Sequence, residues 1–198
     1  MGRSIVQDAS TPSDSDLVAA ALADKRAYAH VLRRWEPLLA RYVRRILGRE
    51  SQAADDVLQE AFLKAYVNLN DYDRTRPFGA WIYRIARNEA INHLRKRKIE
   101  PPFVNGDDAL LLLGRLSDGI TAQEIFDGAR MNERIRAAID AMPARYREAL
   151  ALRYLEDRGY DEIAEIMQLP SGTVATLINR GTKQLRASLK AAASSGLL

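Results

Sequence analysis

YDEIAEIMQLPSGTVATLINRGTKQL, residues 160–185, decides the fold, because it holds two helical patterns separated by a tight turn. Its apolar positions recur at helical spacing on both sides of the turn: Ile163, Ala164, Ile166, Val174, Leu177 and Ile178. Leu169 and Pro170 form the turn, and Ser171 opens the second helix. The small side chain of Ala164 lets the two helices approach closely. This spacing is typical of a helix-turn-helix, whose second helix enters the major groove of DNA.

The second helix of this motif carries the residues expected to bind duplex DNA. A helix N-terminus presents unpaired N–H groups that suit a phosphate, and hydroxyl side chains add donors. The expected contacts are Ser171, Thr173, Thr176, Asn179, Arg180 and Lys183. An ordinary helical hairpin within a bundle has the same apolar spacing, so that alternative stays open at this point.

The rest of the patterned sequence is also helical. Apolar residues at spacings of three and four predict helical faces over residues 17–31, 38–47, 52–69, 80–98 and 130–193. Gly48 is the expected end of the second of these helices. The last range is interrupted near Pro143, Gly159 and Pro170. No stretch alternates as a strand would, so the predicted fold class is all-α.

Composition divides the chain into two small helical domains. The predicted parts are a flexible tail (1–14), a first domain (15–98), a flexible linker (99–129) and a second domain (130–193). Pro101 and Pro102 end the helix before the linker. The apolar run Leu110–Leu113 predicts either a short packing helix or a segment that docks an inhibitory partner or the protein's own domains.

A second candidate DNA-binding surface lies on the last helix of the first domain. Its basic and amide residues recur at spacings of three and four, with one further lysine beside them: Arg84, Arg87, Asn88, Asn92, Arg95 and Lys96. Cations meet phosphates and amides read base edges. Tyr72, Phe78, Trp81 and Tyr83 lie in or beside the preceding turn, and stacked rings hold single-stranded bases at about 1–3 kcal/mol per base. The alternative is a solvated helix end with Phe78 and Trp81 in the core.

The third feature is an acidic and amide face on the helix predicted over residues 52–69. Asp55, Asp56, Gln59 and Glu60 lie opposite its apolar stripe. Adjacent carboxylates point in different directions on a helix, and no further ligand stands nearby to complete a metal site. The face is therefore either solvated or a protein-binding surface.

Composition excludes several classes of function. The 198 residues contain no cysteine and two histidines, which leaves no thiolate site and no basis for a metal centre or a Ser-His triad. No phosphate-binding loop or hydrolase motif occurs, so neither an enzyme nor a cofactor is expected. The start of the chain lacks a signal peptide and no run spans a bilayer, which predicts a cytoplasmic protein without membrane insertion. A net charge of +4 suits a polyanion-binding protein.

Three segments together resemble the extracytoplasmic-function group of the sigma-70 family of bacterial sigma factors. They are AADDVLQEAFLKAYVNL (53–69), FGAWIYRIARNEAINHLRKR (78–97) and MPARYREALALRYLEDRGYDEIAEIMQLPSGTV (142–174). The resemblance covers about residues 16–97 and 132–190, and the order and separation of the segments are more specific than any one of them.

The resemblance implies a transcription initiation factor that directs core RNA polymerase to promoters. Its acidic face would bind the clamp helices of the largest polymerase subunit through Asp55, Asp56, Gln59, Glu60 and Leu63. The turn and basic helix would open and hold the −10 element through Tyr72, Arg84, Arg87, Asn88, Asn92, Arg95 and Lys96. The helix-turn-helix would read the −35 element, and the polymerase flap and an anti-sigma factor are further partners to consider. The competing reading is a stand-alone helix-turn-helix regulator that does not need polymerase.

Two departures from the family pattern stand out. After Gly172-Thr173-Val174 the family usually continues with Lys-Ser-Arg, whereas here Ala175, Thr176 and Leu177 follow. Each lost phosphate contact lowers the salt slope of binding by about one unit, which predicts weak −35 binding. Asn92 also stands where an Asp is common.

Overall fold

The computed structural model describes residues 12–116 and 129–194, and within these ranges every regular element is helical. The first domain contains α1 (Asp14–Ala23), α2 (Tyr28–Leu47), α3 (Ala54–Val67) and α4 (Phe78–Lys96). The second contains α7 (Ala129–Asp140), α8 (Ala144–Leu150), α9 (Tyr160–Met167) and α10 (Ser171–Ser194). The predicted all-α architecture with two domains is confirmed. Residues 1–11 of the expected tail lie outside the described residues, and its last residue, Asp14, instead begins α1.

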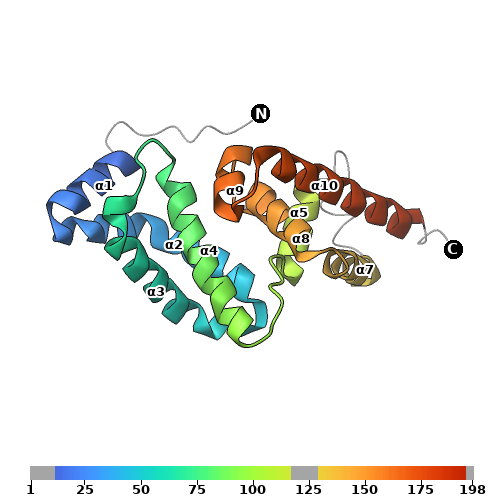
Figure 1. Cartoon of the computed structure of the whole chain (residues 1–198). Coiled ribbons are helices and arrows are strands. Elements are labelled where there is room, and N and C mark those ends of the chain that lie inside the picture. Colours follow the sequence, from blue (N-terminus) through green and yellow to red (C-terminus); the bar gives the residue numbers. More distant parts are fainter. Residues whose placement is uncertain (1–11, 117–128, 195–198) are drawn as a thin grey trace.

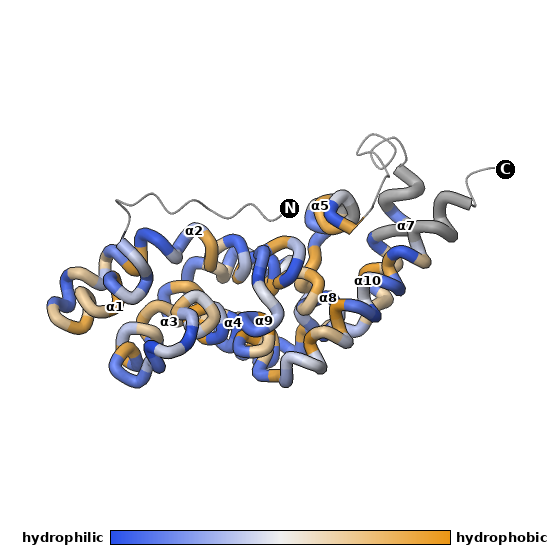
Figure 2. The backbone as a smooth tube through the Cα atoms, turned by 90° about the horizontal axis from the view of Figure 1, so that it is seen from above, coloured by the Kyte–Doolittle hydropathy of each residue, from blue (hydrophilic) through white to orange (hydrophobic). Residues whose placement is uncertain are grey.

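The core of the first domain is built around α2. Val31, Leu39, Val43 and Ile46 of this helix are fully buried, and α1, α3 and α4 all pack against it. Burying each such side chain stabilises the fold by about 1.5–3 kcal/mol. Hydrophobic and hydrophilic stretches alternate along the helices in Figure 2, as expected where each helix buries one face.

The helix ends of the first domain follow from local chemistry. Ser13 and Asp16 form a capping box that starts α1, with the Asp16 amide donating to the Ser13 hydroxyl at 3.2 Å. The single helical face predicted over residues 17–31 is wrong. Asp24 ends α1 and its carboxylate accepts the Arg26 amide at 2.9 Å, which caps a 3-10 turn (Lys25–Ala27) before α2. Gly48 ends α2 as predicted, with a φ of 56°.

The second domain is a helix-turn-helix supported by α7 and α8. A π-helical turn, η4 (Ala151–Leu155), extends α8, and α10 packs closely on α8 through Gly181. A Cβ on Gly181 would lie 3.2 Å from a methyl carbon of Leu150, so glycine permits this approach. The apolar residues predicted for the motif's core are buried, except half-buried Ala164: Ile163, Ile166, Val174, Leu177 and Ile178.

The two domains are packed against each other. Figure 1 shows α9 lying beside α4, and the view from above in Figure 2 shows the same neighbours. The surface of the first domain that meets the second is therefore formed by α4 together with the adjacent part of α2, whose Arg41 and Arg45 reach across the contact.

Part of the predicted linker is ordered against both domains. Its apolar run lies in the helix α5 (Gly106–Leu116), of which Ala109, Leu112 and Leu116 are buried. The Asp108 carboxylate accepts two bonds of 2.8 Å from Arg45 of the first domain. Arg186 of α10 donates to the Leu116 carbonyl at 3.1 Å. The packing-helix alternative for Leu110–Leu113 is thus the one that the structure contains, with Leu112 buried and Leu111 59% exposed.

No helix in the described part of the chain is both long and apolar enough to cross a membrane.

Candidate nucleic-acid interface

The aromatic turn before α4 belongs partly to the core and partly to the surface. Phe78 and Trp81 are buried, while Tyr72 is half-buried with its ring centroid 5.2 Å from Phe78 and 5.3 Å from Trp81. Burial raises the pKa of the Tyr72 hydroxyl. Beside these rings lies a hollow of about 200 Å³, lined by Asp71, Tyr72, Asp73, Arg76, Trp81, Arg84 and Glu165. The ring edges and cations of this hollow suit a nucleobase and its phosphate.

The predicted residues of α4 differ in accessibility and in their neighbours, and Asn92 and Lys96 line a hollow with Asp56 and Glu60 of α3. Arg95 and Lys96 are exposed, and Asn88 and Asn92 are half-exposed. Arg84 and Arg87 are partly covered because each pairs with a glutamate of the second domain. Arg84 pairs with Glu165 of α9, and the Nη2 of Arg87 donates to Glu148 of α8 at 3.0 Å. The basic surface is therefore present and half of its cations are already occupied.

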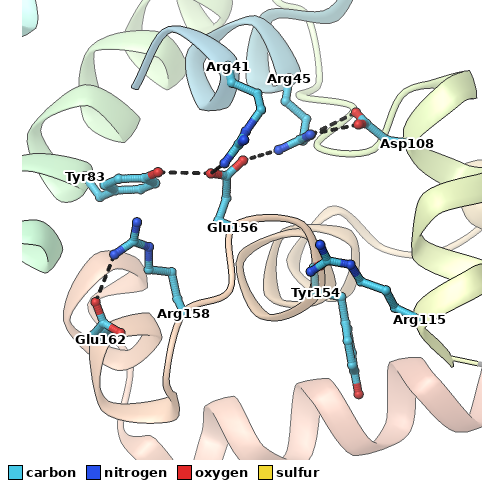
Figure 3. Close-up of polar contacts among 9 residues, drawn as sticks. All are labelled: Arg41, Arg45, Tyr83, Asp108, Arg115, Tyr154, Glu156, Arg158 and Glu162. Atoms are coloured by element: carbon cyan, nitrogen blue, oxygen red, sulfur yellow. Dashed lines mark hydrogen bonds and ion pairs between the residues drawn. The ribbon is translucent and has the colours of Figure 1, made fainter. Parts of the chain in front are cut away.

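A buried glutamate lies at the centre of the contact between the domains (Figure 3). The carboxylate of Glu156, which is 4% exposed, accepts the Tyr83 hydroxyl at 2.9 Å and an Arg41 Nη2 at 3.1 Å. It also pairs with Arg45, which Asp108 holds from the other side. Tyr83, predicted to lie beside the aromatic turn, instead points into this network, and burial raises its pKa.

Arg158 adds an aromatic contact to the same interface. Its guanidinium carbon lies 4.4 Å from the ring centroid of Tyr83 and 5.9 Å from that of Trp35, within the range of a cation–π interaction. Glu162 of α9 accepts a bond of 3.2 Å from the same guanidinium (Figure 3). Desolvation alone would lower the pKa of Arg158, but the neighbouring Tyr83 and Glu162 raise it overall.

Sequence reasoning missed these glutamates and Arg158. Glu148 precedes Leu152 and Leu155 by four and seven positions, which is the spacing of one helical face, and it is only 2% exposed. An acidic residue on an apolar helical face indicates that its carboxylate pairs with a cation inside the protein, and this signal could have identified Glu148. No comparable signal marks Glu156 or Glu165.

The acidic face of α3 is open. Asp55, Asp56, Gln59 and Glu60 are all exposed, and so are two large apolar residues of the helix, Leu63 at 56% and Val67 at 67%. Beside them a groove of about 320 Å³ runs between α2 and α3, lined by Leu32, Glu36, Ala40, Arg44, Asp55, Leu58, Gln59 and Phe62. Exposed apolar side chains ringed by acids are typical of a protein-binding surface.

Helix α10, the second helix of the helix-turn-helix, begins directly after the turn. Gln168 ends α9 in the left-handed conformation, with a φ of 54°, and the Ser171 hydroxyl donates to Asp161 at 3.0 Å. The predicted duplex contacts are all exposed: Ser171, Thr173, Thr176, Asn179, Arg180 and Lys183. The Thr176 hydroxyl donates back to the Gly172 carbonyl at 2.9 Å.

The two positions that depart from the family pattern differ in environment. Leu177 is 9% exposed and belongs to the core, whereas Ala175 is half-exposed. Where the family pattern has a cation at position 177, this chain therefore has a leucine of the core. Where the pattern has a cation at position 175, this chain has a small residue at the surface.

Comparisons with known proteins agree with this anatomy. The family profile described as Sigma-70 region 2 matches residues 31–99, and the one described as Sigma-70, region 4, matches residues 132–185. The chain is 33% identical over 173 residues to the ECF RNA polymerase sigma factor SigW of Bacillus subtilis, covering 84% of this chain and 91% of that one. It is 34% identical over 177 residues to the RNA polymerase sigma-H factor of Pseudomonas aeruginosa, covering 84% and 88%.

Solved structures share the fold. CnrH in complex with the cytosolic domain of CnrY superimposes with a TM-score of 0.60 at 24% identity, covering 88% of this chain and 96% of that one. The sigma factor RpoE of Bartonella quintana, in complex with the anti-sigma factor NepR, gives 0.55 at 23% identity, covering 82% and 96%.

Proposed function

The chain belongs to the sigma-70 family of RNA polymerase sigma factors, in its extracytoplasmic-function group, and from this premise we propose how its surfaces divide the work of promoter recognition. As a sigma factor it binds core RNA polymerase and directs initiation at particular promoters. The observation that supports the division is that an exposed acidic face with an apolar side chain, a basic aromatic site and the second helix of a helix-turn-helix lie on three different helices, α3, α4 and α10.

The exposed face of α3 is the proposed polymerase contact. Leu63 would insert between partner side chains while Asp55, Asp56, Gln59 and Glu60 pair around it. An apolar anchor inside a charged rim concentrates binding energy at its centre. The clamp helices of the largest subunit are the expected partner, with the flap as a second contact. This face also distinguishes the chain from a stand-alone DNA-binding regulator, which would have no use for it.

The hollow beside Tyr72 and the basic face of α4 are the proposed site for the −10 element. Melting DNA costs about 1.4 kcal/mol per base step, and flipping a base out costs a few kcal/mol more. Stacking at about 1–3 kcal/mol per base, with phosphate pairs from Arg84, Arg87, Arg95 and Lys96, offsets this cost without a nucleotide hydrolysis step. Asn88 and Asn92 would read base edges.

The N-terminal half of α10 is the proposed −35 reader. Ser171 and Thr173 lie at the helix start, where backbone N–H groups meet a phosphate, and Asn179, Arg180 and Lys183 follow along the exposed face. We propose that the protein has no catalytic activity of its own, acts in the cytoplasm and is open to control by an anti-sigma factor.

Transcription with purified core polymerase tests the assignment. Genomic fragments from the source organism are transcribed with and without the protein, and the 5′ ends of the transcripts are mapped. The expected result is a set of start sites that share sequence near −10 and −35 and depend on the protein. Identical start sites with and without it would refute the function, and loss of these sites in Leu63→Glu would support the α3 contact.

A further inference from the structure

A stripe of cations runs along α2 and the 3-10 turn before it, and none of the three proposed surfaces includes it. Its exposed positions recur at spacings of three and four residues, which place them on one side of the helix. The members of this basic stripe are Arg26, His30, Arg33, Pro37, Arg41 and Arg44. The stripe therefore combines four arginines with no carboxylate.

The stability of the helix accounts for only part of this stripe. A positive charge is favourable near the end of a helix and unfavourable near its start. Arg44 lies in the last turn of α2 and pairs with Asp55 at 3.3 Å, whereas Arg26 lies directly before the first turn. The described part of the chain contains no carboxylate within ion-pair distance of Arg26 or Arg33. These two cations can therefore bind an anion from outside the chain.

The composition of the stripe indicates which kind of anion it binds. Protein interfaces concentrate their binding energy at buried apolar or aromatic side chains, and the α3 face offers Leu63 for this purpose. The stripe has no such side chain, since Pro37 is its only apolar member. A phosphate backbone needs no apolar anchor, because cations bind it through the release of its counterions. The stripe therefore suits a nucleic acid better than an acidic protein segment.

The length of the stripe also suits an extended polyanion. Between Arg33 and Arg44 the helix rises by about 16 Å, at about 1.5 Å per residue. Successive phosphates on one strand of a duplex are about 3.4 Å apart along its axis, so this length spans about five of them. The cations of α2 can therefore contact several phosphates of one strand.

One edge of the stripe lies close to the hollow beside Tyr72. Arg34, next to the stripe on α2, binds Asp14 at the start of α1 at 2.8 Å. α1 packs against the turn Leu69–Asp71, and Figure 1 shows it beside the loop that leads into α4. Burial raises the pKa of the Tyr72 hydroxyl, and the charge of Asp14 raises it further. A strand that leaves the hollow over the start of α1 would therefore reach Arg34 and then Arg33.

We propose that the basic stripe of α2 is a second nucleic-acid site of the first domain, which binds the phosphate backbone of DNA without reading its sequence. Arg26 and Arg33 are the principal contacts, and Arg41 and Arg44 extend the site along the helix. The stripe adds to the three surfaces already proposed and does not depend on which promoter element the hollow binds. It lengthens the DNA that the first domain holds and makes that binding more sensitive to salt.

The test removes two cations of the stripe and keeps polar side chains in their place. Arg26→Gln/Arg33→Gln is compared with Arg136→Gln/Arg145→Gln, which removes two exposed cations from α7 and α8. Each whole chain is titrated against a fluorescein-labelled 24-mer of random sequence, as a single strand and as a duplex, at several salt concentrations. Anisotropy is the signal, and circular dichroism melting checks that the variants are folded. A third variant, Arg26→Lys/Arg33→Lys, keeps both charges.

The glutamine pair in the stripe is expected to bind DNA about tenfold more weakly than its control at low salt. Its salt slope should be shallower by about 0.7 per arginine on the single strand, or by about 0.9 per arginine on the duplex. A change on one form of the probe alone would assign the stripe to that form. The lysine pair should bind like the original protein, because a phosphate contact needs the charge. Equal affinities and slopes for the glutamine pair and its control on both forms would overturn the proposal.

A cross-linking measurement separates DNA from an acidic protein partner. Because the chain has no cysteine, a photoactivatable cross-linker is attached through Arg33→Cys on α2, and through Glu133→Cys on α7 as the control. Each labelled protein is assembled with core polymerase and the genomic fragments of the transcription assay. Cross-links from position 33 to DNA are expected, and cross-links from it to a polymerase subunit alone would overturn the proposal. Identical start sites with and without the protein would refute the proposed function and would leave the binding titrations unaffected.

Discussion

Restoring the two cations that the reading helix lacks should have opposite consequences at the two positions. Ala175 is half-exposed at the start of α10, whereas Leu177 is 9% exposed in the core of the helix-turn-helix. We expect Ala175→Lys to strengthen binding to duplex DNA and Leu177→Arg to destabilise the second domain. The family pattern alone would predict tighter binding from both.

The magnitudes follow from burial. Removing a buried leucine forfeits about 1.5–3 kcal/mol of apolar burial, and an arginine recovers part of it by extending its charged end to solvent. A net loss of about 2 kcal/mol lowers the melting temperature by roughly 4–8 °C for a chain of this size. Ala175→Lys keeps the stability within about 0.5 kcal/mol, as surface substitutions usually do. One added phosphate contact steepens the salt slope of duplex binding by about 0.9.

The assay combines thermal melting by circular dichroism with anisotropy titrations of a random-sequence 22-base-pair duplex at several salt concentrations. Ala187→Lys, at an exposed position further along α10, serves as the control for an added charge on the same helix. A Leu177→Arg variant that melts with the original protein would refute the burial argument. If Ala175→Lys and Ala187→Lys steepen the salt slope equally, the proposed phosphate contact at position 175 is refuted.

Other predictions concern the polymerase face, the core and pH. Leu63→Ala should weaken core polymerase binding about tenfold in a competition assay without changing the melting temperature, as hot-spot truncations do, whereas Leu111→Ala, equally exposed on α5, should not. Gly79→Ala should destabilise by about 1–2 kcal/mol in urea unfolding, because its Cβ would lie 2.6 Å from the buried Trp35 ring; unchanged stability would mean that the ring moves. Burial and the nearby Arg97 lower the pKa of His93, so its contribution to stability is complete above about pH 6.5 and is lost as the pH falls through the lowered value. His93→Gln should flatten the stability profile below about pH 6.5, measured by urea unfolding at each pH.

Local periodicity accounts for what could be predicted from the sequence. The burial of Ile163, Val174 and Ile178, and the exposure of Asp55 and Glu60, follow from spacings of three and four within single helices. Helix ends at glycine and proline were predictable for the same reason. The break at Asp24 could not be predicted in this way, because the Ala, Leu and Lys residues around it favour helix. The Asp24 carboxylate caps the next turn by accepting the Arg26 amide, and the apolar pattern does not reveal such a polar contact.

Such local patterns cannot predict which residues of the two domains pair with each other. Arg87 meets Glu148 across 61 positions and Arg84 meets Glu165 across 81. Nothing local distinguishes an arginine that faces DNA from one that faces a glutamate of the same chain, since both lie on the polar side of α4. The sequence therefore predicted which residues form the basic face and could not predict that part of it is covered.

The chemistry of the covered face determines how easily it can be uncovered. An interface closed by apolar side chains would resist opening in proportion to its area, whereas this one is centred on Glu156, Arg45, Arg41 and Tyr83. Moving a carboxylate and a guanidinium out of water costs several kcal/mol each, and their attraction returns a similar amount. When the domains separate, both groups regain water. The free energies of the packed and the separated arrangements therefore differ only by the small difference between the desolvation cost and the attraction. A partner that binds the separated arrangement with a modest preference can then shift the balance.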